Sequence, residues 1–170
     1  DEPIGYADLE NSRQSLLHHL ETSVQYTLSH RGPHSLPLIG HADWNDCLNL
    51  NCFSKEPNES FQTAGVVEGS IAESVMIAGL FLYATREMEE LYDWLNDSEN
   101  AANMRKHYAE MLDIVEKHAW DGKWYIRAFD ATGKAVGSSQ CQEGQIFIES
   151  QAWCLLGGAG EASGRTEEVL

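Results

Sequence analysis

The sequence predicts an all-α fold in which long helices follow one another in antiparallel layers. Apolar residues recur at helical spacing in several stretches of the 170-residue chain. Two neighbouring stretches differ in pattern: residues 71–84 are apolar almost all round, whereas the stretch after residue 97 is apolar on one face only. This alternation favours a double-layered helical array over a four-helix bundle, in which every helix shows a similar apolar stripe.

The first helix is predicted over residues 7–29, because leucines recur there at helical spacing. Gly32 and Pro33 follow at positions where helices commonly stop. A stretch without helical periodicity then extends over residues 36–65. A loop of that length is uncommon unless it is functional, so we expect the chemistry of the chain to lie there.

The second helix is predicted over residues 68–94, with its apolar part buried on most sides. A third helix begins at Asp97 or Ser98, since either residue is a good N-cap. We expect the third helix to be half buried along a stripe that consists of Met104, Tyr108, Met111 and Val115.

Shorter elements follow the third helix. Residues 120–125 indicate a turn into a short strand, and residues 130–134 indicate a hairpin-like turn. A last complete helix is predicted over residues 149–156, before Gly157 and Gly158, and residues 165–170 have the pattern of a helix just beginning. Long loops and a short β-hairpin therefore accompany the helices.

Composition excludes several classes of protein. The chain has 27 acidic against 11 basic residues and a formal net charge of −16, which argues against binding to nucleic acid or to an anionic membrane surface. The longest apolar run, residues 75–83, is far shorter than the ~20 residues that span a bilayer. The four cysteines form no C-x-x-C pair, so we expect reduced thiols, no metal site and a cytoplasmic location.

The densest group of chemically useful side chains is Asp43-Trp44-Asn45-Asp46, just after Gly40. An indole face can stack on the apolar face of a sugar ring, and Asn and Asp can hydrogen-bond to hydroxyl groups. A carboxyl group packed against an aromatic ring loses solvation, which raises its pKa and suits it to protonate a glycosidic oxygen. An Asx-rich turn that caps a helix, with Trp44 in the core, is the alternative, and composition alone favours it.

Residues 36–53 resemble the catalytic segment of the cellobiose phosphorylases, in glycoside hydrolase family 94. The string Asp-Trp-Asn-Asp-Cys-Leu-Asn is specific, and similar segments occur in cellodextrin and chitobiose phosphorylases. Supporting likeness continues along the whole chain and includes residues 5–10, 73–74, 120–127 and 144–153.

The resemblance implies an (α/α)6 barrel and the inverting phosphorolysis of cellobiose to α-glucose 1-phosphate and glucose. Asp46 then matches the general acid, and Trp44 matches a residue that binds the transferred glucosyl unit. Inorganic phosphate is the nucleophile and is already anionic, so a second carboxylate is not required as a base. Asp43 is accordingly expected to hydrogen-bond to substrate or to hold the loop.

Four further residues are candidate substrate contacts. Cys47 adjoins the candidate acid, Arg127 follows a Trp-Tyr strand, and Glu149 and Gln151 lie where a helix begins after a loop. A structural arginine and ordinary helix capping are equally good explanations for the last three. Glu73 stands on an apolar stretch and needs a partner, so we expect a core ion pair in preference to a site residue.

The resemblance also implies a domain organisation. Residues 1–170 correspond to the central part of the barrel, without the N-terminal β-rich region and the C-terminal part of the barrel. Because the chain has few cations and no basic cluster, we expect the phosphate-binding residues to lie outside it. No cofactor is expected beyond inorganic phosphate as co-substrate, and the whole protein is expected to be a homodimer. We expect these residues alone to be inactive and prone to aggregate.

Three alternatives stay open. The first is a phosphorylase for cellodextrins or another β-glucoside. The second is an inverting glycosidase on the same barrel, which requires a second carboxylate roughly 6.5–9.5 Å from the acid. The third belongs to another class, a non-catalytic helical module that binds sugar or a protein partner.

Overall fold

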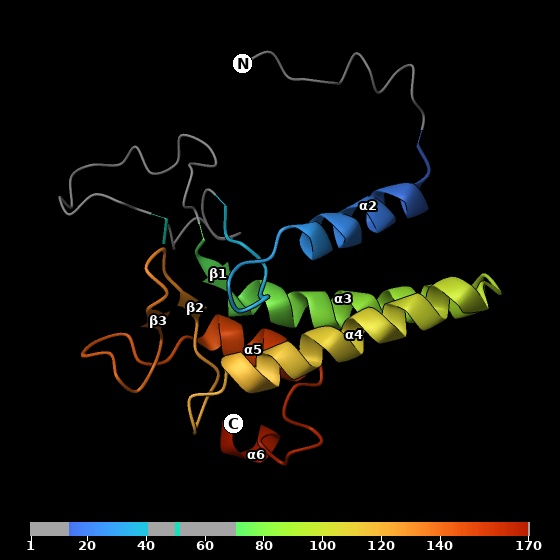
Figure 1. The fold of residues 1–170 in the computed structure, drawn as a ribbon. Coiled ribbons are helices and arrows are strands. Elements are labelled where there is room, and N and C mark those ends of the chain that lie inside the picture. The colour runs from blue at the N-terminus through green and yellow to red at the C-terminus, as the bar shows by residue number, and fades with distance from the viewer. Residues whose placement is uncertain (1–13, 41–49, 52–70, 170) are drawn as a thin grey trace.

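The computed structural model describes residues 14–40, 50–51 and 71–169. Within these ranges the chain forms five helices and one small three-stranded sheet (Figure 1). The sheet lies at one end of the long helices (Figure 1). The predicted helical class is therefore observed, with a short β-hairpin as expected, whereas closure of the helices into a barrel stays a prediction.

Helices α3 (Val75–Trp94) and α4 (Ser98–His118) run antiparallel side by side (Figure 1). The Asp97 side chain caps α4 by accepting a hydrogen bond from Asn100 N at 3.1 Å, as its sequence position predicts. Met111 and Val115 of α4 are fully buried against α3, so the predicted stripe is confirmed. The two helices form the centre of the core.

The beginning of α3 differs from its prediction. The helix was expected from residue 68, but it begins at Val75, and Glu73–Ser74 form strand β1. The Ser74 side chain ends the strand and caps the helix by accepting a hydrogen bond from Ile77 N at 3.1 Å. An extended backbone at this point lets residues 73 and 74 pair with another segment, which a helix does not allow.

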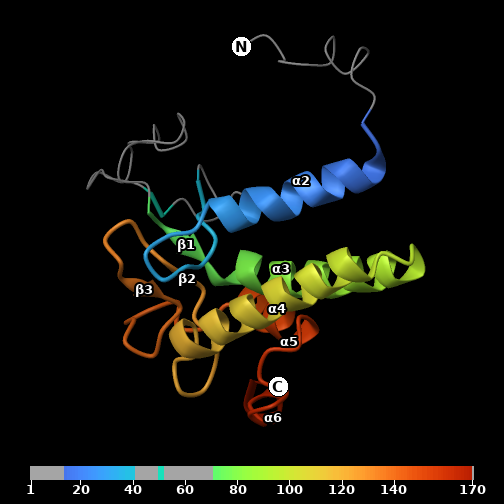
Figure 2. The same cartoon turned by 45° about the vertical axis from the view of Figure 1, so that its right-hand side comes forward.

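Helix α2 (Leu16–Ser29) lies above α3 in the view of Figure 2. It was expected from residue 7 but begins at Leu16, where the Ser15 side chain caps it by accepting from His18 N at 3.1 Å. Residues 7–13 lie outside the described part. Val24 is the buried contact of α2 with the core, and Tyr92 Oη of α3 donates to Glu21 Oε1 at 2.7 Å.

Helix α5 (Ile148–Leu156) packs against α3 at two glycines, which confirms the predicted last complete helix. A Cβ on Gly79 of α3 would lie 2.6 Å from Cys154 N, and one on Gly157 would lie 2.8 Å from Gly79 O. The two backbones therefore approach more closely than any side chain permits. The short helix α6 (Thr166–Val169) follows, next to an ion pair between Arg165 and Glu116 of α4.

The sheet has the order β1-β2-β3, and both pairs are antiparallel. Strands β2 (Ala128–Phe129) and β3 (Ala135–Val136) form the predicted hairpin, and Asp130 Oδ1 accepts from Thr132 N and Lys134 N in its turn. Residues 37–39 run along the other side of β1, where Ser74 N donates to Pro37 O at 2.9 Å. The sheet thus joins residues 37–39 to β1, which directly precedes α3, and to the β2–β3 hairpin, which follows α4.

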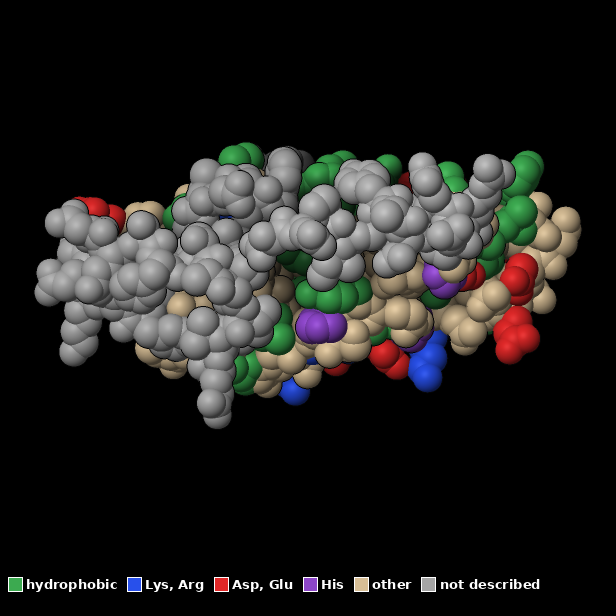
Figure 3. Space-filling view, turned by 90° about the horizontal axis from the view of Figure 1, so that it is seen from above, with side chains coloured by type: hydrophobic (Ala, Val, Ile, Leu, Met, Phe, Trp, Pro, Cys, Tyr) green, Lys and Arg blue, Asp and Glu red, His purple; other side chains and the backbone are tan. Residues whose placement is uncertain are grey.

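Further findings concern composition and surface. None of the described helices is long and apolar enough to span a bilayer, and the described residues contain no cluster of three or more His, Cys, Asp or Glu suited to a metal ion. Cys141 and Cys154 are free thiols, whereas Cys47 and Cys52 lie outside the described residues. On the face shown in Figure 3, acidic side chains lie near the end of the molecule away from the sheet, and others lie in the middle and at the opposite end.

Candidate functional site

Residues 41–49 carry the Asp43-Trp44-Asn45-Asp46 string and form the candidate catalytic segment within residues 36–53. Asp43, Trp44, Asp46 and Cys47 lie within residues 41–49, outside the described residues, so their assigned roles stay predictions. The structure does describe Gly40 on one side of this segment and Leu50 with Asn51 on the other. The site is therefore built here from the residues that support the segment.

Asn51 ties the two ends of the segment together. Its Nδ2 donates to Gly40 O at 2.7 Å, and its Oδ1 accepts from Ala72 N at 3.0 Å. The side chain is almost fully buried, with 4% of the residue exposed. A third bond, from Ala131 N to Leu50 O at 2.9 Å, joins the segment to the β2–β3 turn. The base of the segment is thus closed by one amide side chain and attached to the sheet.

Glu73 supports the chain that leads into the segment. Its Oε1 accepts from His34 N at 2.9 Å and from Leu36 N at 3.1 Å, and its Oε2 lies 2.5 Å from His34 Nδ1. The partner that the sequence predicted for the buried Glu73 is therefore His34, whose own side chain is partly exposed. A Cβ on Gly32 would lie 2.4 Å from Glu73 Cγ, so this turn needs a glycine. The carboxylate holds residues 32–36 against β1.

Arg127 is fully buried beside the junction of β1 and α3. Its guanidinium donates to Ser74 Oγ at 3.3 Å and lies 3.7 Å from Met76 Sδ. Its backbone joins the same elements, because Val75 N donates to Arg127 O and Arg127 N donates to Val136 O. The structure therefore places Arg127 in the interior next to the sheet, and its predicted contact with substrate stays a prediction.

The amide group of Gln151 is engaged by backbone. Its Oε1 accepts from Tyr125 N at 2.8 Å, and its Nε2 donates to Tyr125 O at 2.6 Å and to Phe147 O at 3.1 Å. Gln151 therefore pairs with Tyr125 as a neighbouring strand would, and this fixes α5 against the chain that enters β2. This geometry favours a structural role over the predicted sugar contact.

Glu149 occupies the first turn of α5 and is half buried. Phe147 holds the N-cap position and makes no side-chain capping bond, so Glu149 is not the cap of this helix. A carboxylate in the first turn is favoured by the helix dipole. This placement leaves the predicted substrate contact of Glu149 open.

The described candidates therefore surround the sheet, but they form no single cluster. Arg127 faces the start of α3, Gln151 faces Tyr125, and Glu149 lies two residues before Gln151 on α5. Sequence reasoning overlooked Asn51 as the residue that closes the candidate segment. Its position five residues after the second aspartate of the motif was the available signal, because polar residues that follow a functional loop often hold it.

Comparison with known proteins defines the class. All of residues 1–170 match the family described as the Glycosyl hydrolase 94 superfamily, catalytic domain, and the chain belongs to this family. The predicted family is confirmed.

Several of the similar proteins are disaccharide phosphorylases. The chain is 30% identical to solabiose phosphorylase of Paenibacillus borealis over 90% of its own length and 18% of that protein. It is 29% identical to 3-O-beta-D-glucopyranosyl-beta-D-glucuronide phosphorylase of the same organism, over 98% of the chain and 20% of that protein. It is 28% identical to N,N'-diacetylchitobiose phosphorylase of Vibrio proteolyticus, over 93% of the chain and 17% of that protein.

The chain thus spans about a fifth of the length of these relatives. Their names refer to saccharides other than cellobiose, so the comparisons support the disaccharide phosphorylase class without selecting cellobiose.

Proposed function

We propose that the protein containing these residues is an inverting disaccharide phosphorylase with an (α/α)6 barrel, and that cellobiose is its substrate. The observation that carries the proposal is the family match over the full 170 residues, together with the string Asp43-Trp44-Asn45-Asp46 within it. The products are α-glucose 1-phosphate and glucose. Phosphorolysis of cellodextrins or of another β-glucoside is the alternative within the class.

The reaction needs one acid and one nucleophile. Asp46 protonates the glycosidic oxygen as the bond to the anomeric carbon breaks, and an oxygen of inorganic phosphate attacks that carbon from the opposite face. The leaving sugar keeps the proton, and the configuration at the anomeric carbon inverts. Trp44 stacks on the transferred glucosyl unit, and Asp43 and Cys47 are further candidate substrate contacts.

The described residues support this proposal by fixing the backbone on either side of the segment. Asn51 joins Gly40 to Ala72, Glu73 fixes residues 34–36, and Arg127 and Gln151 brace the sheet and α5. A general acid must be brought within hydrogen-bonding reach of the proton acceptor, so fixed ends of its segment favour catalysis.

Phosphate binding, assembly and location form part of the same proposal. The net charge of −16 disfavours a phosphate site built from this chain alone, so residues elsewhere in the protein bind the phosphate. The protein acts as a homodimer in the cytoplasm. Both features follow from the resemblance and the cysteine pattern rather than from the fold.

The test is a turnover assay on the full-length protein that contains these residues. Cellobiose, cellotriose and N,N'-diacetylchitobiose are incubated with and without inorganic phosphate, and proton NMR identifies the products. We expect phosphate-dependent release of α-glucose 1-phosphate from cellobiose. Release of free sugars alone, without dependence on phosphate, indicates the inverting glycosidase instead, and no turnover of any saccharide supports a non-catalytic module.

Asp46→Asn tests the acid. We expect kcat to fall by about 100- to 10,000-fold, since amide cannot donate the required proton. Asp113→Asn is the matched control, because Asp113 is exposed on α4, and its kcat should stay within about twofold of the wild type. Unchanged turnover in Asp46→Asn would remove Asp46 from the mechanism.

A further inference from the structure

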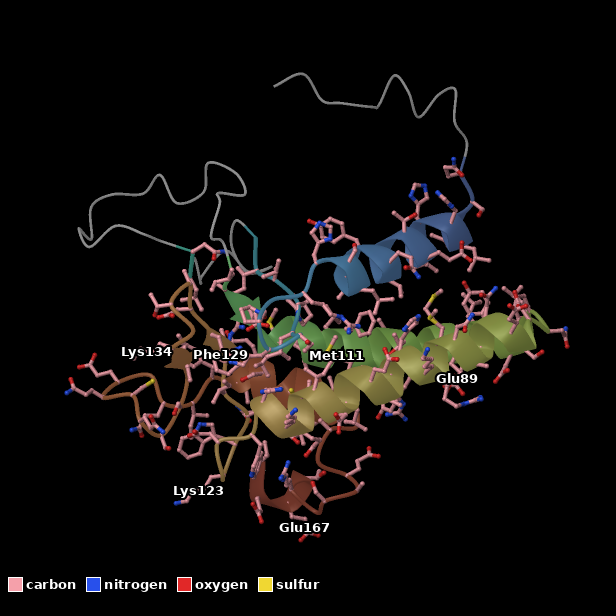
Figure 4. The ribbon with its side chains drawn as sticks, viewed as in Figure 1. Glu89, Met111, Lys123, Phe129, Lys134 and Glu167 are labelled. Atoms are coloured by element: carbon pink, nitrogen blue, oxygen red, sulfur yellow. The ribbon has the colours of Figure 1, made fainter. Side chains whose placement is uncertain are left out.

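Two histidine rings lie side by side where α4 ends near the sheet. His34, in the chain that follows α2, and His118, the last residue of α4, have ring centroids 5.4 Å apart. The His34 ring also stacks on Phe129 of β2, with the centroids 3.8 Å apart and the ring planes 18° from parallel. Figure 4 shows Phe129 at the sheet end of the molecule, well away from Glu89 near the far end of the long helices.

A buried carboxylate holds one of these two rings. The Glu73 side chain is only 1% exposed, and its Oε2 lies 2.5 Å from His34 Nδ1, so a proton lies between the two atoms. The Oε1 of the same carboxylate accepts hydrogen bonds from the backbone of His34 and of Leu36. The place of residues 34–36 against β1 therefore depends on the charge and protonation of a few neighbouring groups.

The surroundings of His118 disfavour a positive charge on its ring. Partial burial lowers the pKa of His118 below its usual value of 6.5, and the positive charges of Lys117 and of protonated His34 lower it further. Glu73 and Asp113 act in the opposite direction without reversing the shift. A histidine whose pKa is lowered in the folded state stabilises the fold above its usual pKa, and this contribution is lost as the pH falls.

One buried carboxylate can balance one imidazolium, whereas two adjacent imidazolium rings repel each other. We propose that His34, Glu73 and His118 form a pH-sensitive latch, which holds residues 32–36 against β1 at neutral pH and releases them in acid. Protonation of His34 alone strengthens its pairing with Glu73, but protonation of His118 places a second positive charge beside the first. The His34 ring is the one that moves away, because its side chain is 28% exposed and lies outside any helix.

Amide hydrogen exchange tests the latch directly, because the amides of His34 and Leu36 donate to Glu73. The full-length protein is exchanged at about pH 7.5 and about pH 5.5, on either side of the ordinary histidine pKa, and mass spectrometry follows peptides that cover residues 32–37. Dividing the intrinsic rate at each pH by the measured rate gives a protection factor. We expect the protection factor of these amides to fall roughly two- to fivefold in acid, the effect of a partly exposed charge pair. Protection of Met111 and Val115 in the core should not change.

Two variants of His118 carry opposite expectations. His118→Gln cannot take up a proton, so protection of residues 32–37 should not fall in acid. His118→Lys is positively charged at both pH values, so protection should be low at both. His19→Gln is the matched control, because His19 is an exposed histidine on α2, and it should respond to pH as the wild type does.

Equal protection of residues 32–37 at the two pH values in the wild type overturns the latch, and so does the same fall in His118→Gln. A fall that extends to Met111 and Val115 reports global unfolding in acid and also counts against a local latch. The measurement needs no substrate and no turnover. Its result therefore stands whether or not the full-length protein is a disaccharide phosphorylase.

Discussion

Polar side chains in the interior of this domain act as connections between distant backbones. Asn51 and Glu73 are both almost fully buried, and each accepts hydrogen bonds from backbone N–H groups of another segment. Gln151 does the same for Tyr125. A buried polar group is tolerated only when such bonds replace those to water, so these residues determine which loops lie together.

Asn51→Ala tests whether a buried amide side chain holds separate backbone segments together. The change removes both bonds of the amide and leaves Ala72 N buried without its acceptor, at a cost of about 1–3 kcal/mol in unfolding free energy. Thermal unfolding of the full-length protein, followed by calorimetry, should show a lower Tm. Asn103→Ala is the control, because Asn103 is exposed on α4. Equal Tm values for the two variants would contradict the role of Asn51.

Asn51→Asp refines the same prediction. The aspartate keeps an acceptor for Ala72 N but turns a carboxylate oxygen toward Gly40 O, where the wild type has a donor. Repulsion between the two oxygens should lower Tm at neutral pH, and acidification that protonates the carboxyl should restore part of the loss. A Tm that does not depend on pH in this way would argue that the Gly40 bond contributes little.

At the scale of elements, the contact between α3 and α5 depends on the absence of side chains. Gly79 faces the backbone of Trp153 and Cys154, and Gly157 faces Leu82. Glycine inside a helix lowers its intrinsic stability, so its presence in α3 is explained by tertiary packing rather than by helix propensity. Tertiary structure also decides where α3 begins, because Glu73–Ser74 form strand β1 where a helix was expected.

Gly79→Ala separates propensity from packing. Propensity alone predicts a gain of roughly 1 kcal/mol, whereas the added Cβ would lie 2.6 Å from Cys154 N and 2.7 Å from Trp153 C, both in backbone that cannot rotate away. Overpacking should prevail with a net loss of about 1–3 kcal/mol, measured as a fall in Tm. Glu87→Ala, at an exposed position of the same helix, should change Tm little, and a Tm raised by Gly79→Ala would refute the close packing.

At the scale of the whole molecule, large apolar side chains remain on the surface. Leu16 is 75% exposed, Trp94 77% and Ile148 74%, and these residues belong to three different parts of the fold. Exposed apolar side chains scattered singly are normal, but Leu95 beside Trp94 is 43% exposed and Ile146 near Ile148 is 58% exposed, and such groups favour association.

This exposure supports the expectation that residues 1–170 alone aggregate or fold weakly. We expect the isolated chain to bind the dye ANS and to sediment as a mixture of oligomers, whereas the full-length protein should do neither at the same concentration. Analytical ultracentrifugation and ANS fluorescence provide the two measurements. A soluble monomer with one cooperative thermal transition would show that the exposed residues are tolerated.

Much of the fold could be predicted because its signals are local. The apolar stripe of Met111 and Val115 repeats within one helix, Asp97 caps the turn that follows it directly, and Asp130 organises the hairpin turn that it begins. The string from Asp43 to Asp46 likewise indicated the family from contiguous residues, and the match over the chain confirmed that family.

The supporting residues of the candidate site could not be predicted in the same way. Asn51 meets Gly40 and Ala72, Glu73 meets His34, and Gln151 meets Tyr125, all across separate segments. Glutamine and asparagine can hydrogen-bond to any backbone group, so the sequence does not indicate which distant residue will be the partner. The helical pattern in the sequence also began before Ser74, whereas pairing of residues 73 and 74 with β2 makes the helix begin at Val75.

The sequence by itself therefore determined the succession of helices, the Asp97 cap, the hairpin and the family, because each depends on residues close together in the chain. Only the tertiary structure decided where α3 begins and which side chain closes the base of the candidate segment. The physical reason is that burial and hydrogen bonding between distant segments are set by packing, which overrides local preference.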